Sequence, residues 1–242
     1  MTSIQYISLF AAAGVGSIVA FYFQKSNTQL LKWVLSFSGA YLLGVTFLHL
    51  LPETYENGGA TMGFWVLGGF LIQILLDQLT QGVEHGHIHA HQHASSRFAA
   101  SVLVGISIHA LLEGLPLDGF GLHNNHAHYQ LLWGILMHKP PEAFALVLLL
   151  LSSGFSRRVV IGIAILFASV SPLGAWIGAW LETNQILGSN GTVYIMALVI
   201  GSFFHIATTI LYENEGNASH HIAWQRLIAI LLGIGVATLT MH

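Results

Sequence analysis

The stretch ILMHKPPEAF, residues 135–144, places a histidine, a lysine, a glutamate and two prolines inside a long apolar run. Ionisable side chains within a membrane helix are costly and indicate a functional site, and proline removes a helical hydrogen bond. The whole chain is suited to a membrane: 54% of its 242 residues are hydrophobic and only 7% are charged, whereas soluble domains have about 25% charged residues. The sequence therefore predicts an integral membrane protein.

Apolar runs of about 20 residues, the length of a helix that crosses a bilayer, recur along the chain. We predict eight transmembrane helices, at residues 4–23, 31–52, 62–82, 98–119, 129–152, 159–181, 191–212 and 222–240. The runs lack the alternation of barrel strands, so the expected fold class is an all-α, polytopic membrane protein. The connections are short, which predicts a single transmembrane domain over residues 1–242, with the bilayer as partner.

Basic residues predict the orientation of the chain. Outside the apolar runs or at their edges there are six: Lys25, Lys32, Arg97, Arg157, Arg158 and Arg226. All six fall near the loops after the first, third, fifth and seventh runs, so these loops are expected in the cytoplasm and both termini outside it. No basic patch suggests a nucleic-acid partner. The absence of cysteine excludes disulfides and thiolate metal sites.

Three of the predicted helices carry the pattern His-x-x-x-Glu. Residues four apart share one face of a helix, so each pair places an imidazole beside a carboxylate. These ligands suit Zn²⁺, and also Fe²⁺, Mn²⁺, Co²⁺ or Cd²⁺. We therefore predict metal ligands in three pairs, which are His49 and Glu53, His109 and Glu113, and His138 and Glu142.

Prolines accompany these pairs. Pro116, Pro140 and Pro141 each leave a backbone carbonyl without its helical donor, which at membrane depth is tolerated beside a water-filled cavity. His109 lies about 16 Å along its helix, near the middle of the bilayer. His49 and Glu53 lie nearer the outer end of their helix. They would serve as an entrance or as an upper ligand. The alternative is that the Glu53 carboxylate simply reaches interfacial water.

The eight spans, the histidine-rich third loop, H-x-x-x-E-G at 109–114 and H-x-x-P-E at 138–142 together resemble the ZIP (Zrt-, Irt-like protein) family of divalent-metal transporters. The resemblance implies uptake of zinc, or a similar ion, into the cytoplasm, and often a homodimer. It also implies a metal site formed by His109, Glu113, His138 and Glu142, with His49 contributing. A plasma membrane or bacterial inner membrane is the expected location, and residues 1–242 would form the transport domain.

The chain departs from the family at three places. Many members hold a second metal through residues that correspond to Ala110 and Lys139, and neither of these side chains binds a cation. Lys139 is expected to replace that metal and to balance the charges of Glu113 and Glu142, which makes the site mononuclear. The alternative is that Lys139 extends to the outer interface. In the 191–212 run the usual midway carboxylate is missing, and His205 either substitutes for it or packs between helices.

The segment VEHGHIHAHQH carries alternate histidines in a low-complexity stretch of the 83–97 loop. Such a stretch has no packed core of its own. We expect it to be a cytoplasmic accessory site for metal capture or sensing, and the alternative is a solvated linker. The histidines concerned are His85, His87, His89, His91 and His93.

Two other functions use the same residues. An intramembrane zinc hydrolase would ligate the metal through His109, His138 and Glu142, with Glu113 as base. A membrane metal sensor would need the site but no continuous pathway. Carboxylates and prolines along one route, with histidine tracts beside it, favour a transporter rather than an enzyme. No Walker-type motif indicates ATP as the driving force.

Overall fold

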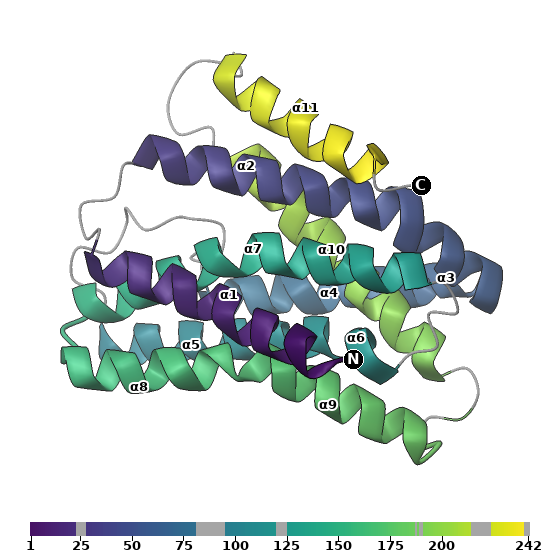
Figure 1. The fold of residues 1–242 in the computed structure, drawn as a ribbon, viewed down its shortest axis with the longest axis horizontal. Helices are drawn as coiled ribbons and strands as arrows, with labels where there is room; N and C mark the ends of the chain where they lie inside the picture. The colour runs from purple at the N-terminus through teal and green to yellow at the C-terminus, as the bar shows by residue number, and fades with distance from the viewer. Residues whose placement is uncertain are drawn as a thin grey trace.

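The structure is a computed structural model and describes residues 1–22, 28–80, 95–119, 125–186, 188, 191–213 and 224–239. Every secondary-structure element in these ranges is a helix, and no strand occurs within them. The long helices lie alongside one another in a bundle (Figure 1). The expected all-α fold of a polytopic membrane protein is therefore confirmed.

The helical elements differ in length, and one of them, η1, is a π-helix. In chain order they are α1 (Ser3–Tyr22), α2 (Thr28–Val45), η1 (Thr46–Leu50), α3 (Leu51–Gly58), α4 (Met62–Thr80), α5 (Ser96–Gly114), α6 (Pro116–Gly119), α7 (Asn125–Ser152), α8 (Arg157–Ala168), α9 (Val170–Thr183), α10 (Gly191–Glu213) and α11 (Trp224–Leu239).

Seven helical segments in the described residues are long and apolar enough to cross a membrane. They coincide with the first seven predicted runs: α2, η1 and α3 together form one of them, and α8 and α9 form another. The eighth run corresponds to α11, an apolar helix of 16 residues. Its passage through the membrane and the outside location of both termini stay predictions.

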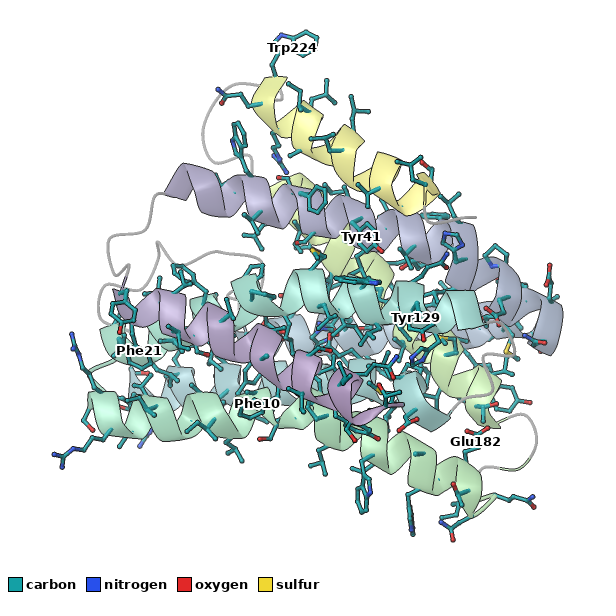
Figure 2. All side chains as sticks on the ribbon, in the orientation of Figure 1. Phe10, Phe21, Tyr41, Tyr129, Glu182 and Trp224 are labelled. Carbon is teal, nitrogen blue, oxygen red and sulfur yellow. The ribbon has the colours of Figure 1, made fainter. Side chains whose placement is uncertain are left out.

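Large apolar side chains cover the outside of the bundle, as expected for a surface that faces lipid. Phe64 and Trp224 are each 78% exposed, and Leu231 is 60% exposed. Trp224 points away from the bundle at the start of α11 (Figure 2). Such an apolar surface would be unfavourable in water. The exposure of these side chains therefore agrees with the membrane protein that the composition predicts.

Prolines lie close to the positions where the long helices widen or break. Pro52 cannot donate to the carbonyl of Leu48, and the turn before it widens into η1, in which the Leu51 N–H reaches the Thr46 carbonyl. Pro116 begins α6 directly after the end of α5, and Pro172 follows the break between α8 and α9. By contrast, α7 continues through Pro140 and Pro141.

Close backbone contact holds α1 against the double proline of α7. A Cβ atom added to Gly16 would lie 2.0 Å from the carbonyl oxygen of Pro140, so only glycine fits there. A similar contact joins α5 to α9, where a Cβ on Gly114 would lie 2.3 Å from the Ser171 carbonyl oxygen. Small residues permit such approaches in membranes, and these two contacts position the helices that carry the predicted site.

The apolar core has two parts. One contains Leu42 of α2, Ile135 of α7 and Ile200 of α10. The other contains residues of α1, α5, α7 and α8, and it includes Ala143 of α7 and Phe167 of α8. The ionisable residues at 138–142 lie between Ile135 and Ala143, so α7 places them where the two apolar clusters meet.

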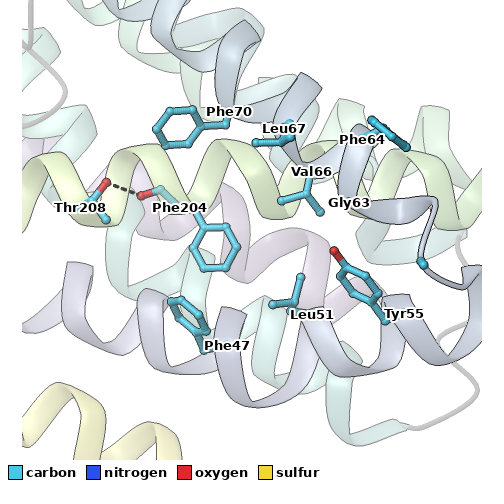
Figure 3. Close-up of a pocket in the computed structure, with 11 residues that line it drawn as sticks. Phe47, Leu51, Tyr55, Gly63, Phe64, Val66, Leu67, Phe70, Phe204 and Thr208 are labelled. Carbon is cyan, nitrogen blue, oxygen red and sulfur yellow. Dashed lines mark hydrogen bonds between the residues drawn. The ribbon is translucent and has the colours of Figure 1, made fainter.

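An apolar groove of about 630 Å³ opens on the side of the bundle between η1, α3, α4 and α10. Its walls include Phe47, Tyr55, Phe70 and Phe204 (Figure 3). None of the six predicted metal ligands is among the residues that line it. The groove is therefore separate from the predicted site.

Candidate metal site

Helices α5 and α7 bring four of the predicted ligands together in the interior. His109, Glu113 and His138 are each 1% exposed, and Glu142 is fully buried. Nε2 of His109 lies 3.5 Å from Oε2 of Glu113 on the same helical face. The rings of His109 and His138 meet edge to face, with centroids 6.3 Å apart. Four ionisable groups thus share one apolar interior, an arrangement that membrane proteins keep for functional sites.

Lys139 enters the same cluster. Its ammonium lies 2.8 Å from Oε2 of Glu142 and also contacts Oε1 of Glu113. The side chain is 1% exposed, and its nitrogen lies 5.0 Å from the centre of the Phe167 ring. Lys139 therefore lies between the two carboxylates and does not extend to the membrane interface. Its one positive charge faces two negative charges.

Ser171 of α9 also contacts this cluster, although no sequence pattern predicts it. Its hydroxyl donates to Oε1 of Glu113 over 2.9 Å. The Gly114–Ser171 backbone contact brings α9 close enough for this bond. A lone serine in an apolar run carries too little information to be found from sequence, although its position beside Pro172 is a weak signal.

The cluster is not arranged around a cation in this conformation. Within the described residues, no group of three or more His, Asp or Glu side chains is close enough to hold a metal ion. The Lys139 ammonium contacts both Glu113 and Glu142, and it lies where the two carboxylates would converge on a metal. Ligation of a metal by all four predicted residues would therefore require the lysine to move.

His49 and Glu53 belong to η1 and α3, not to α5 or α7. His49 belongs to η1, and its Nε2 lies 3.3 Å from the carbonyl oxygen of Ala237 in α11. Glu53 is half-buried in the first turn of α3, where its backbone carbonyl accepts a bond from Asn57. His49 lies within the wide π-turn that precedes Pro52. The structure thus directs His49 to α11, whereas His109, Glu113, His138 and Glu142 face one another.

Helices α4 and α10 contribute a polar network that the predicted ligand pairs do not include. The Ser202 hydroxyl donates to Oε1 of Gln73 over 2.7 Å and lies 3.4 Å from Nδ1 of His109. Further along the same two helices, Nε2 of His205 lies 3.7 Å from Oδ2 of Asp77. The signal for Gln73 was available, because a glutamine within an apolar run needs a polar partner.

The accessory histidines lie outside the described residues. These are His85, His87, His89, His91 and His93. Helix α5 begins at Ser96, and the Ser95 side chain accepts a hydrogen bond from the Phe98 N–H. The role of this tract as a metal-binding loop stays a prediction.

Comparison with known proteins gives consistent matches. The model of the family described as ZIP Zinc transporter matches residues 84–241. The chain is 28% identical over 175 residues to the zinc transporter ZIP9-B of Xenopus laevis, a match that covers 69% of this chain but only 56% of that protein. It is 27% identical over 255 residues to the zinc transporter ZupT of Chlorobium phaeovibrioides, covering 95% of this chain and 92% of that protein.

Proposed function

The chain belongs to the ZIP zinc transporter family, and we propose on that premise that it carries a divalent metal ion, zinc first, across a membrane into the cytoplasm. The observation that carries the proposal is the buried group of His109, Glu113, His138 and Glu142 on adjacent faces of α5 and α7. Imidazole and carboxylate are ligands for zinc and for Fe²⁺, Mn²⁺, Co²⁺ or Cd²⁺. A hydrolase receives no support from a family of transporters.

The spacing of one pair is compatible with zinc ligation. Two donors bound to the same tetrahedral Zn²⁺ at about 2.0–2.1 Å lie about 3.4 Å from each other. His109 Nε2 and Glu113 Oε2 are 3.5 Å apart, so one ion fits both with little movement. His138 and Glu142 would complete the ligand set when the Lys139 ammonium leaves the carboxylates.

Lys139 is proposed to balance charge at the position where the family pattern described above would hold a second metal. Its contacts with Glu113 and Glu142 support this role, because an ammonium at this position repels a second cation. The neighbouring position that would supply another ligand is Ala110, which is fully buried. The proposed site therefore binds one divalent ion at a time.

The remaining parts of the pathway are proposed from the sequence pattern. His49 and Glu53 would serve as an entrance on the outer side. The tract from His85 to His93 would capture or sense metal in the cytoplasm. A plasma membrane or bacterial inner membrane is the proposed location, and a homodimer is the proposed assembly.

Uptake of ⁶⁵Zn²⁺ into proteoliposomes that hold the purified protein tests this function. We expect time-dependent influx that Glu142→Ala abolishes, because that substitution removes a fully buried carboxylate of the cluster. Glu182→Ala is the matched control, since Glu182 is an exposed acidic residue at the end of α9. Zinc binding without influx would support a sensor and overturn transport.

A further inference from the structure

Lys139 contacts more than the two carboxylates, because its ammonium also faces the joint between α8 and α9. The nitrogen lies over the ring of Phe167, 5.0 Å from the ring centre. Phe167 is in the last turn of α8, and Ser171 follows four residues later in the first turn of α9. The Ser171 hydroxyl donates to Glu113. Two residues that flank the break between α8 and α9 therefore both reach the ionisable cluster.

The ammonium and the Ser171 hydroxyl donate to the same atom, Oε1 of Glu113. Two donors on one oxygen lie close to each other, so Ser171 is a near neighbour of the Lys139 nitrogen. A serine hydroxyl has acceptor lone pairs as well as its one proton. Ser171 can therefore accept a hydrogen bond from an ammonium while it donates to Glu113.

A metal ion bound by Glu113 and Glu142 would separate the Lys139 ammonium from both carboxylates inside an apolar interior. Lys139 and Phe167 are each 1% exposed, and Phe167 belongs to the apolar cluster that also contains residues of α1, α5 and α7. A buried charge without a partner is costly, and a divalent cation on the carboxylates would repel the ammonium. The attraction between a cation and an aromatic face is strongest where water is excluded. The Phe167 ring is therefore suited to receive the displaced charge.

We propose that Phe167 and Ser171 form a seat that receives the Lys139 ammonium when a divalent metal ion takes Glu113 and Glu142. This inference rests on the proposed function, because the lysine changes partners only if a metal binds at that site. The ammonium keeps its charge and exchanges two carboxylates for an aromatic face and a hydroxyl oxygen. The seat lowers the cost of displacing the lysine, so it increases the affinity of the site for the metal.

The displacement is measured first, by NMR of the purified protein with ¹³C- and ¹⁵N-labelled lysine. The chain has three lysines, Lys25, Lys32 and Lys139, and the signals that Lys139→Met removes belong to Lys139. Protons above the face of an aromatic ring are shielded, so zinc should move the ε-CH₂ proton signals of Lys139 upfield. Phe167→Leu should abolish this upfield shift. Zinc binding that leaves the Lys139 signals in place would overturn the inference.

Zinc affinity is measured next, by titration calorimetry. The ring is a main partner of the ammonium only in the metal-bound state, since the carboxylates hold the ammonium in the metal-free state. Loss of a desolvated cation–π contact corresponds to about tenfold in affinity, and Phe167→Leu should weaken zinc binding by that factor. Site-specific replacement of Phe167 by trifluorophenylalanine retains the packing of the ring and weakens the negative potential on its face. It should also weaken zinc binding, and unchanged affinity in this variant would reject the role of the ring.

A double-mutant cycle with Lys139→Met separates the seat from packing. Without an ammonium to receive, Phe167→Leu should change the zinc affinity by no more than about twofold, the usual limit for independent sites. Ser171→Ala enters the same cycle because its hydroxyl also bonds to Glu113, and its effect should be larger when Lys139 is present. Equal losses with and without Lys139 would mean that both residues act through packing, which would overturn the inference.

The matched control is Phe203→Leu. Phe203 of α10 is also 1% exposed, but it belongs to the other apolar cluster. The variant should lose packing as Phe167→Leu does and retain the zinc affinity and the Lys139 shift of the wild type. If the wild type binds zinc without the Lys139 shift, the seat is rejected while the proposed function stands. If the wild type binds no zinc, the proposed function fails and the seat fails with it.

Discussion

The Lys139 ammonium lies 2.8 Å from the Glu142 carboxylate one turn away on α7, and it contacts Glu113 on α5. All three side chains are buried, with exposed fractions of at most 1%. The lysine thus supplies, from within the chain, positive charge at the place where a transported cation is proposed to bind. A metal ion bound at the proposed site would therefore compete with the lysine for the same two carboxylates.

Lys139→Met should make the metal-free protein less stable and more dependent on zinc. Removing one partner of a buried ion pair leaves an uncompensated charge and costs about 3–5 kcal/mol. Bound zinc would supply the missing positive charge, so the increase in Tm on zinc addition should be larger in the variant than in the wild type. Thermal unfolding in detergent, with and without zinc, measures both effects.

Lys32→Met controls for the loss of a lysine as such, because Lys32 lies in α2 and is half-buried. Its Tm should respond to zinc as the wild type does. An unchanged zinc response in Lys139→Met would show that the ammonium and the metal ion do not compete.

A second metal should bind when both departures from the family pattern are reversed. Lys139→Asp with Ala110→Asn replaces an ammonium and a methyl group by two oxygen ligands, which divalent cations accept. Titration calorimetry or elemental analysis should then give one ion per chain more than the wild type binds. The single variant Ala110→Asn should bind as many ions as the wild type, because Lys139 is retained. An unchanged number of ions in the double variant would reject the charge-balancing role.

His49→Ala should raise the KM for zinc influx and leave the maximal rate close to that of the wild type. His49 contacts the Ala237 carbonyl on α11, so the four central residues can bind an ion without it. Influx measured over a range of zinc concentrations separates the two parameters. His49→Gln, which retains a donor for the Ala237 carbonyl, should raise KM equally if the imidazole itself captures zinc. Complete loss of influx in either variant would instead place His49 in the main site.

The parts of this protein that sequence predicts well are those set by local patterns. Apolar length located seven helical segments that are long enough to cross a membrane, and the four-residue spacing placed His109 beside Glu113. The partners of these residues were harder to foresee. Ser202 and Gln73 are 129 residues apart in the chain, so only the packing of α10 on α4 brings them together. The direction of the His49 side chain depends on a π-turn. A proline in the sequence indicates that a helix is disturbed, but it does not indicate where a neighbouring side chain points.

Gly16→Ala should destabilise the protein and slow zinc influx. Its new methyl group would lie 2.0 Å from the Pro140 carbonyl oxygen, so α1 must move away from the double proline next to Lys139 and Glu142. Overpacking of this kind costs about 1–3 kcal/mol, and thermal unfolding together with ⁶⁵Zn²⁺ influx measures the result. Gly14→Ala is the matched control on the same helix, because a Cβ atom at Gly14 meets no atom of the described residues within 4 Å. Equal stability and influx in the two variants would show that contact between α1 and the prolines of α7 has no part in shaping the site.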